Sequence, residues 1–332
     1  MSGWERRMGR LNAWYMTSGE AGFRTQARGL ATTVAGGSRE LIVGLRPPFR
    51  ALPGAWAAPF ALAGLAESSD RPAPPWPDLL ISCGRRTTAL AIAIRRASRG
   101  KTLAVHVQNP LTGVSAFDLV VAMDHDHVSG PNVLSVPTAL HDVTPTRLAA
   151  AGKAWRERLI RPDRPLIGVL LGGATRHHPF EAAEAKVLIE RLQSVRRATG
   201  AALAVTPSRR TPEDVRDLFA AALAGDPDAF LWDLQGDNPY LGILDLADRL
   251  VVTSDSVSMI SEALATPHPV EVFGPDGGRR HAEFLGGLVA KGLVRRFEGD
   301  PAPPPAGGPI DATEIAARAV RALLQARTTV PG

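Results

Sequence analysis

Cysteine and tyrosine are scarce in this sequence of 332 residues, which contains one cysteine and two tyrosines. Cys83 is the single cysteine, so the chain can form neither an internal disulfide nor a thiolate zinc site, and a reducing cytoplasm is the expected compartment. No apolar run approaches the roughly 18 residues of a membrane span, and the first residues lack the apolar core of a signal peptide. We therefore expect a cytoplasmic protein that is soluble or attached to a membrane surface.

Several catalytic motifs are also missing. The sequence contains no G-x-S-x-G, no P-loop lysine motif, no H-E-x-x-H and no C-x-x-C. These absences exclude a serine hydrolase with a nucleophile elbow, a P-loop NTPase, a zincin and a zinc ribbon. The adjacent His177 and His178 would point apart on a regular element, so we expect no metal site there.

Charge is distributed unevenly along the chain. Residues 1–150 contain 16 basic and 10 acidic side chains, a net charge of +6, whereas residues 151–332 contain 22 and 23, a net charge of −1. This asymmetry favours an anionic membrane surface or a phosphorylated ligand as partner, with a solvated basic face as the alternative. We do not expect nucleic acid, because no helix-turn-helix or RNP-like pattern accompanies the basic residues.

Short apolar runs rich in β-branched residues alternate with helical patterns, which is typical of parallel sheets built from β-α-β units. The runs predicted as strands are Ala13–Thr17, Glu40–Gly44, Leu79–Ser82, Leu103–Val107, Leu119–Ala122, Val133–Val136, Leu166–Leu171, Ala201–Thr206, Ala229–Trp232, Arg249–Thr253 and Val270–Phe273. The sequence therefore predicts an α/β protein with two doubly wound, Rossmann-like domains.

Prolines around a predicted helix at 147–159 mark the crossing between these domains. We place the N-terminal domain at 1–150, a linker at 151–163 and the C-terminal domain at 164–305. A proline-rich stretch then leads to a final helix, which Asp311 and Glu314 open as an Asp version of the capping box. Its single apolar stripe predicts that the segment 306–332 packs against another part of the protein.

Polar residues follow the predicted strand at 249–253 and lead into a helix. They are Ser254, Asp255, Ser256 and Ser258. The free N–H groups and positive dipole end of a helix start suit a phosphate, and Glu262, less than two turns on, is placed to hydrogen-bond a sugar hydroxyl. Simple N-capping by Asp255 or Ser256, with a solvated Glu262, is the alternative interpretation.

Other turns at strand ends in the second half carry groups that suit a phosphate. Adjacent glycines allow close approach of the backbone to a ligand, and hydroxyl and guanidinium groups can donate to it. The candidate residues in these turns are Gly172, Gly173, Thr175, Arg176, Ser208, Arg209, Arg210 and Asn238. Thr211 and Asn238 are also expected N-caps with proline at the first helical position, so capping alone is the alternative.

Two strand ends in the first half are candidates for an acceptor site. The residues concerned are Gly19, Gly22 and Gln26 after the first strand, and Arg85 and Arg86 after the strand at 79–82. Two arginines at a helix start suit a phosphate or a carboxylate. Cys83, beside them, is interpreted as a small turn residue, because no His or Asn signature of a thiol nucleophile surrounds it.

A catalytic base is predicted after the strand at 119–122. There His125 lies between Asp124 and Asp126, either of which can orient its imidazole as a general base. A polar loop without catalytic function is the alternative.

Segments spread over most of the chain resemble bacterial members of the ELM-type mitochondrial-fission family. These segments are 14–31, 81–87, 107–110, 117–134, 171–178, 206–211, 236–240 and 252–270. The last of them also resembles the nucleotide-sugar half of GT-B glycosyltransferases, such as the enzyme that makes lipid II, and of UDP-GlcNAc epimerases. The resemblance implies two Rossmann-like domains that face a cleft, with a C-terminal helix that crosses back to the first domain.

Individual residues match these families position by position. Glu262 matches the glutamate that holds the nucleotide ribose, the segment 256–258 matches the helix start that faces the diphosphate, and Gly172 with Gly173 matches the glycine turn. Ser18 and Phe23 depart from the ELM-type pattern, which usually has Asp and then His or Asn at these positions. We therefore do not expect a catalytic base at these N-terminal positions, and His125 remains the predicted base.

The resemblance implies a metal-independent GT-B-type glycosyltransferase, which needs no cofactor and uses a nucleotide-diphosphate sugar for cell-envelope glycoconjugates at the inner membrane. A nucleotide-sugar epimerase, and an inactive ELM-type scaffold or membrane-associated binding protein, are the alternatives. Four apolar residues of the first half either touch the membrane or form a buried helix face, namely Trp56, Phe60, Leu62 and Leu65. The sequence identifies no sugar, acceptor or protein partner.

Overall fold

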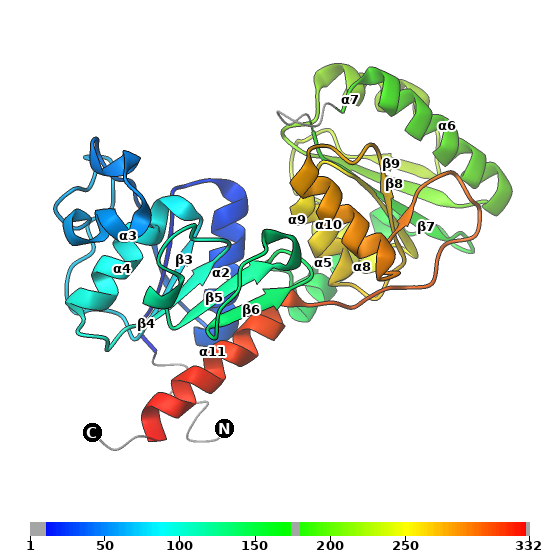
Figure 1. The fold of residues 1–332 in the computed structure, drawn as a ribbon. Helices are drawn as coiled ribbons and strands as arrows, with labels where there is room; N and C mark the ends of the chain where they lie inside the picture. Colours follow the sequence, from blue (N-terminus) through cyan, green and yellow to red (C-terminus); the bar gives the residue numbers. More distant parts are fainter. Residues whose placement is uncertain (1–10, 174–179, 330–332) are drawn as a thin grey trace. The chain divides into compact units, whose positions relative to one another are not determined.

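The computed structural model describes residues 11–173 and 180–329, which fold into two α/β units (Figure 1). Unit 1 ends at Asp142 and takes up the chain again from Asp311, and unit 2 is Val143–Ile310. This division differs from the predicted linker at 151–163, because the helix at that position packs inside unit 2. Trp155 of this helix is 7% exposed and stacks edge-on against Phe230, with ring centroids 5.8 Å apart.

Unit 1 contains one six-stranded sheet in the order β2-β1-β3-β4-β5-β6, with every pair of neighbours parallel. Its strands are β1 (Ala13–Thr17), β2 (Arg39–Ile42), β3 (Leu79–Cys83), β4 (Leu103–Val107), β5 (Leu119–Met123) and β6 (Val133–Val136). Its helices are α2 (Ala21–Ala35), α3 (Gly54–Ala57), α4 (Thr88–Ala97) and α11 (Ala312–Thr329). The chain winds one way from β1 to β2 and the other way from β3 onward, so the winding reverses between β1 and β3.

Side chains of these strands alternate between two apolar layers. Ala13 and Tyr15 pack in the layer that includes buried residues of α2 and α11, whereas Trp14 and Met16 pack in the layer with α4. Since both faces of the sheet are covered, its strands consist of almost continuous apolar residues, which is why the sequence shows them clearly.

Unit 2 repeats this plan with the order β12-β11-β10-β7-β8-β9, again all parallel. Its strands are β7 (Leu166–Leu171), β8 (Ala202–Pro207), β9 (Ala229–Leu231), β10 (Arg249–Thr253), β11 (Val270–Phe273) and β12 (Arg295–Arg296). Its helices are α5 (Pro145–Leu159), α6 (Ala182–Thr199), α7 (Glu213–Ala222), α8 (Tyr240–Leu246), α9 (Val257–Leu264) and α10 (Arg279–Ala290). Here the winding reverses between β7 and β10.

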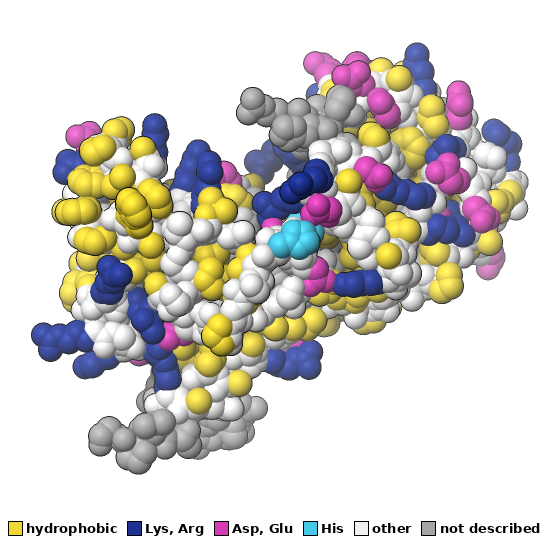
Figure 2. Space-filling view, in the orientation of Figure 1, with side chains coloured by type: hydrophobic (Ala, Val, Ile, Leu, Met, Phe, Trp, Pro, Cys, Tyr) yellow, Lys and Arg dark blue, Asp and Glu magenta, His cyan; other side chains and the backbone are white. Residues whose placement is uncertain are grey.

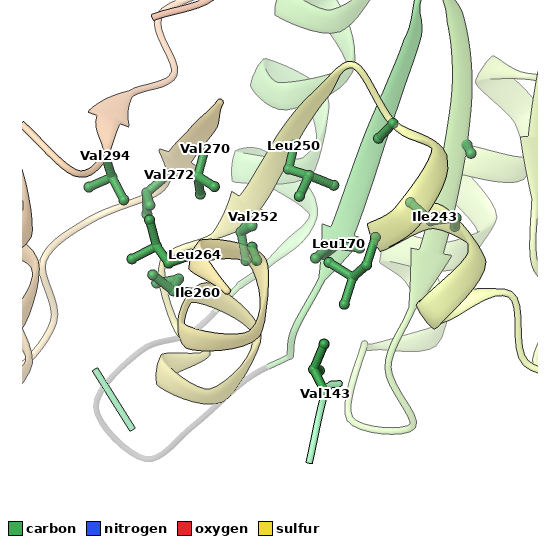
Figure 3. Packing of buried hydrophobic residues seen from close by; sticks show 14 of the residues in the cluster. Val143, Leu170, Ile243, Leu250, Val252, Ile260, Leu264, Val270, Val272 and Val294 are labelled. Carbon is green, nitrogen blue, oxygen red and sulfur yellow. The ribbon is translucent and has the colours of Figure 1, made fainter. Parts of the chain in front are cut away.

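The larger apolar layer of unit 2 lies between the sheet and the helices α5, α8, α9 and α10. Figure 3 shows Leu250 and Val252 of β10 on the same side of the sheet as Ile260 and Leu264 of α9. The opposite face is covered by α6 and α7, which bury Leu188 and other apolar residues against it. Helices on both faces confirm the predicted doubly wound α/β architecture.

The final helix returns to unit 1, as the family resemblance implies. The Thr313 hydroxyl donates to the carbonyl oxygen of His141 and accepts the His141 N–H, both at 2.8 Å. Farther along α11, Arg327 pairs with Asp118 at 2.7 Å. The helix begins as predicted, because Asp311 accepts the Glu314 N–H at 2.9 Å. Within the described ranges, no helix is long and apolar enough to span a membrane.

Candidate functional site

The turns that carry the predicted nucleotide-sugar residues meet at the carboxyl edge of the sheet in unit 2. In doubly wound sheets, ligands bind where the winding reverses, because the loops on the two sides diverge and leave a crevice. In unit 2 this reversal lies between β7 and β10. Gly172 and Gly173 follow β7, and the segment 254–256 follows β10, so these residues flank the reversal point.

A buried carboxylate ties the two turns together. Asp255, whose side chain is 2% exposed, accepts the Gly173 N–H at 2.8 Å and the Thr253 hydroxyl at 2.7 Å. Thr253 in turn accepts the Gly172 N–H at 2.8 Å. A Cβ on Gly172 would lie 2.1 Å from an Asp255 carboxylate oxygen, so this position requires glycine. Asp255 therefore holds the glycine turn and does not cap α9.

The turn after β8 lies beside the same glycines. Ser208 Oγ donates to the Gly172 carbonyl oxygen at 2.7 Å, and a Cβ on Gly173 would lie 2.1 Å from the Arg210 carbonyl oxygen. The Arg210 guanidinium lies 3.8 Å from Asp255 and offsets part of its negative charge. Thr211 was predicted to cap α7, but its hydroxyl bonds to the Leu171 carbonyl oxygen at 3.1 Å, and the helix begins at Glu213. Thr211 thus joins two strand ends.

The start of α9 presents hydroxyl groups at this edge. Ser256 caps the helix by accepting the Met259 N–H at 3.4 Å, which matches the capping interpretation of this residue. Ser258 is half-buried in the first turn. The Ser254 hydroxyl instead donates to the Pro275 carbonyl oxygen at 2.8 Å, and its own carbonyl oxygen bonds to the His281 ring. Ser254 therefore positions the turn after β11, whereas Ser256 and Ser258 form the helix start.

Glu262 lies on α9 and has a partner from another element. The Tyr240 hydroxyl, at the first residue of α8, donates to its carboxylate. Asn238 was predicted to cap α8, and it does accept the Tyr240 N–H at 2.9 Å, but the helix begins one residue later than expected, after Pro239. The turn before α8 and the middle of α9 therefore lie side by side, with both side chains partly accessible.

Three predicted residues of unit 2 remain, and the structure describes one of them. Arg209 is exposed on the turn after β8, next to Arg210. Thr175 and Arg176 lie outside the described residues.

The predicted acceptor residues of unit 1 also flank a reversal of winding, in this case between β1 and β3. Gly19 follows β1 with a φ of +99°, and Gly22 lies in the first turn of α2. Arg85 and Arg86 follow β3, and Arg86 pairs at 3.2 Å with Glu20, the residue that precedes α2. Gln26 lies one turn farther along α2, where it is buried.

Phe23, which differs from the His or Asn usual in the family, packs against a neighbouring turn. A Cβ on Gly84 would lie 2.8 Å from the Phe23 ring, so the ring packs directly on the turn before Arg85. Ser18, the other departure, donates its hydroxyl to Glu20 at 2.6 Å. Both residues therefore shape the turns at this edge.

The predicted base lies on another strand. His125 belongs to a short 3-10 helix, Asp124–Asp126, that follows β5, and β4 separates β5 from β3. Its Nε2 lies 3.9 Å from an Asp126 oxygen, while Asp126 accepts the Met123 N–H at 3.3 Å. Asp124 accepts the Ser135 hydroxyl at 2.7 Å. The cluster therefore lies at the end of β5, with β4 between it and the turn after β3.

The structure also bears on the cysteine and on candidate metal ligands. Cys83 is fully buried, and burial raises the pKa of its thiol because the thiolate would lose its hydration. This agrees with a structural cysteine. In the described part of the chain, no His, Cys, Asp and Glu side chains gather in a group of three or more that could hold a metal ion.

Several residues of the site were missed by sequence analysis. They are Thr253, Tyr240 and His281. Each is distant in sequence from its partner, and only the register of neighbouring strands or the placement of helices on the sheet brings the pair together. The single available signal was the position of Thr253 at the end of a predicted strand.

Comparison with known proteins identifies the family and the fold. Residues 21–324 match the family model described as mitochondrial fission ELM1. The mitochondrial fission protein ELM1 of Arabidopsis thaliana is 32% identical over 277 residues, which cover 76% of this chain and 65% of that protein. The chain thus spans slightly less than two thirds of the length of this relative.

Solved structures of nucleotide-sugar enzymes share the fold. The UDP-GlcNAc 2-epimerase of Methanocaldococcus jannaschii has a TM-score of 0.53 and 12% identity, over 93% of this chain and 99% of that chain. The UDP-GlcNAc 2-epimerase of Neisseria meningitidis, solved with UDP-GlcNAc bound, has a TM-score of 0.51, with the same identity and coverage. The chain therefore belongs to the mitochondrial fission ELM1 family and has the α/β, GT-B-like fold of nucleotide-sugar enzymes.

Proposed function

We propose that this protein is a GT-B-type glycosyltransferase. It takes a sugar from a nucleotide-diphosphate donor bound by unit 2 and transfers it to a cell-envelope lipid or saccharide at the cytoplasmic face of the inner membrane. The observation that carries the proposal is the convergence of the glycine turn and the start of α9, the helix that carries Glu262, at the point where the sheet of unit 2 reverses its winding.

The start of α9 supplies the chemistry for a diphosphate. Its free N–H groups and the hydroxyls of Ser256 and Ser258 donate hydrogen bonds, and its dipole favours negative charge. When the sugar leaves, the charge on the departing nucleoside diphosphate grows, and fixed donors stabilise that charge without reorganising. Asp255 would repel a diphosphate, but Arg210 beside it reduces this repulsion.

Glu262 is the proposed ribose contact. Its carboxylate accepts the Tyr240 hydroxyl, yet two carboxylate oxygens offer about four acceptor positions in total. A ribose hydroxyl can therefore donate to Glu262 while Tyr240 remains in place. In this arrangement Tyr240 orients the carboxylate, and the phosphates extend from the ribose toward Ser256.

We propose His125 as the base. Its imidazole takes the proton of the acceptor hydroxyl as the oxygen attacks the anomeric carbon, and the nucleoside diphosphate leaves with the electrons of the broken C–O bond. Asp126, 3.9 Å from the ring, stabilises the imidazolium that forms.

The proposal is tested by calorimetric titration of the protein with UDP, GDP, ADP and CMP and their sugar conjugates. We expect one nucleotide to bind at micromolar concentration, because the site is preformed by the turns that Asp255 connects. Glu262→Gln should weaken binding about tenfold, the effect of losing one charge-assisted hydrogen bond. Glu190→Gln, an exposed change on α6, serves as the matched control and should leave affinity unchanged.

Two results would separate the alternatives. If no nucleotide binds at millimolar concentration, the enzyme proposal fails. If a nucleotide binds but its sugar conjugate releases no nucleoside diphosphate when a membrane lipid extract is present, the result supports a binding protein that has kept the site and lost catalysis.

A further inference from the structure

A pocket of about 220 Å³ lies in unit 1 where the sheet reverses its winding. It is lined by residues after β1, β2 and β3, including Ser18, Val43, Leu45, Arg85 and Arg86, and by the segment 49–57. Parallel sheets bind ligands at this point, and no part of the proposed donor site occupies it. The pocket is therefore a second candidate site in the chain.

Arginines give this pocket a positive charge. Arg50, Arg85 and Arg86 all line it, and all three are exposed. Arg86 pairs with Glu20 at 3.2 Å, whereas Arg50 and Arg85 have no carboxylate partner among residues 11–173 and 180–329. Guanidinium groups that have no internal counter-ion are suited to bind a phosphate.

The rest of the lining is apolar and continues onto the surface. Leu52 lines the pocket and is 40% exposed, and Phe49 stacks on Phe60 with ring centroids 5.6 Å apart. Phe60 is 52% exposed and Trp56 is 73% exposed. Figure 2 shows hydrophobic side chains gathered over the part of unit 1 that contains α3, with Lys and Arg side chains nearby. An apolar surface thus begins inside the pocket and ends in solvent.

A second loop extends this surface. The Ala55 N–H donates to the Thr112 hydroxyl at 3.2 Å, which holds the loop beside α3, and Leu111 on this loop is 63% exposed. We call Leu52, Trp56, Phe60 and Leu111 the apolar rim. Of the residues that the sequence suggested for a membrane surface, Leu65 is buried and Leu62 packs against the core, so only Trp56 and Phe60 belong to this rim.

We propose that the pocket binds the phosphate head of a membrane lipid, with the apolar rim inserted among the acyl chains of the bilayer. The arginines select an anionic head, and the continuous apolar path lets the aliphatic part leave the pocket without crossing water. An exposed tryptophan at the edge of an apolar patch is typical of residues that settle at a membrane interface. That this lipid is the sugar acceptor rests on the proposed function, whereas its binding to the pocket does not.

The membrane part is tested by flotation of the whole protein with vesicles of phosphatidylcholine, alone or mixed with phosphatidic acid. We expect binding to the mixed vesicles only. The double variant Trp56→Ser, Phe60→Ser should reduce this binding roughly tenfold or more, because both rings lose their buried area in the bilayer. The matched control is Val187→Ser, Val289→Ser, which changes two exposed apolar residues of unit 2 and should bind like the unchanged protein.

The head-group part is tested by titration with dodecyl phosphate, dodecanol and inorganic phosphate. We expect dodecyl phosphate to bind at least roughly tenfold more tightly than either other probe, and Arg85→Gln or Arg50→Gln to weaken it about tenfold. Arg96→Gln, an exposed change on α4, is the control.

Three outcomes would overturn the proposal. They are equal flotation with neutral vesicles, unchanged binding by the rim or arginine variants, and inorganic phosphate binding as tightly as dodecyl phosphate, which would indicate a soluble phosphate site. No nucleotide is present in either assay, so a failure here is separate from a failure of the nucleotide titration.

Discussion

His106 shows how one residue makes stability depend on pH. It lies on β4, fully buried, with its Nδ1 2.8 Å from the Ser82 hydroxyl and its ring 4.8 Å from that of Phe117. Its Nε2 has no hydrogen-bond partner in the described chain. Burial lowers its pKa to about 3 from 6.5, because an imidazolium there would lose its hydration. The native protein therefore holds the neutral ring.

The sign of the effect follows from this lowered pKa. Between pH 6.5 and about 3, the unfolded state binds one proton more than the native state, so stability is lost as the pH falls through this range. From pH 7 to pH 5 we expect this histidine to lower the free energy of unfolding by about 2 kcal/mol. Urea unfolding at the two pH values measures it. His106→Gln should lack this part of the pH dependence, whereas the exposed His127→Gln should keep it; identical slopes for all three proteins would contradict the prediction.

At the scale of secondary structure, the glycine turn after β7 depends on space that only a missing side chain leaves. Gly172→Ala would push a methyl group against the Asp255 carboxylate and disturb its bonds to Gly173 and Thr253. We expect a loss of about 1–3 kcal/mol in the free energy of unfolding, measured with urea. Gly286→Ala, on α10 with open space around it, is the control and should be neutral or stabilising by roughly 0.5–1 kcal/mol. Equal effects of the two changes would show that the close approach has no energetic weight.

The burial of a helix or strand decides whether it could be predicted from the sequence. Every predicted strand is present close to its expected ends, because strands covered on both faces appear as apolar runs. β12 was missed, since two arginines at a sheet edge leave no such run. The helix starts at Thr211 and Asn238 were placed too early, because each hydroxyl or amide serves a longer turn before the helix begins.

The candidate donor site of unit 2 and the pocket of unit 1 also differ in how well their residues could be predicted from sequence. The glycine turn and the start of α9 follow recognisable strands, so their residues were predicted. Trp56 and Phe60 were named as apolar residues, but Arg50, Leu52 and Leu111 were not named, because these lie in loops and short helices where no periodic pattern indicates which side chains meet. The Tyr240–Glu262 bond joins two helices that cover the same face of the sheet, and it leaves no local signal in the sequence.

For the whole molecule, the most important connection is α11, which follows all of unit 2 in the chain but belongs to unit 1. Its buried residues pack in the layer that contains Leu30 of α2 and Ile81 of β3. Arg321 also donates to the Thr33 carbonyl oxygen at 2.7 Å. The stability of unit 1 therefore depends on a helix that is distant from it in sequence.

A pair of matched changes tests this dependence. Leu324→Ala on α11 and Leu288→Ala on α10 remove the same atoms from buried positions, each costing about 2–4 kcal/mol. Hydrogen exchange should speed up in β1 and β3 for the first variant and in β7 and β10 for the second. Faster exchange of unit 2 amides in the Leu324→Ala protein would contradict the assignment of α11 to unit 1.

The return of α11 also determines the order in which the protein can fold on the ribosome. The strands of unit 1 emerge first together with α2, yet the apolar layer that they share with α11 stays partly uncovered until α11 has been translated after Ile310. At usual elongation rates, synthesis of unit 2 in between takes roughly ten to thirty seconds. Unit 2 is one continuous segment, so its synthesis is complete before that of unit 1. Unit 1 therefore begins to be translated earlier but can complete its fold only later.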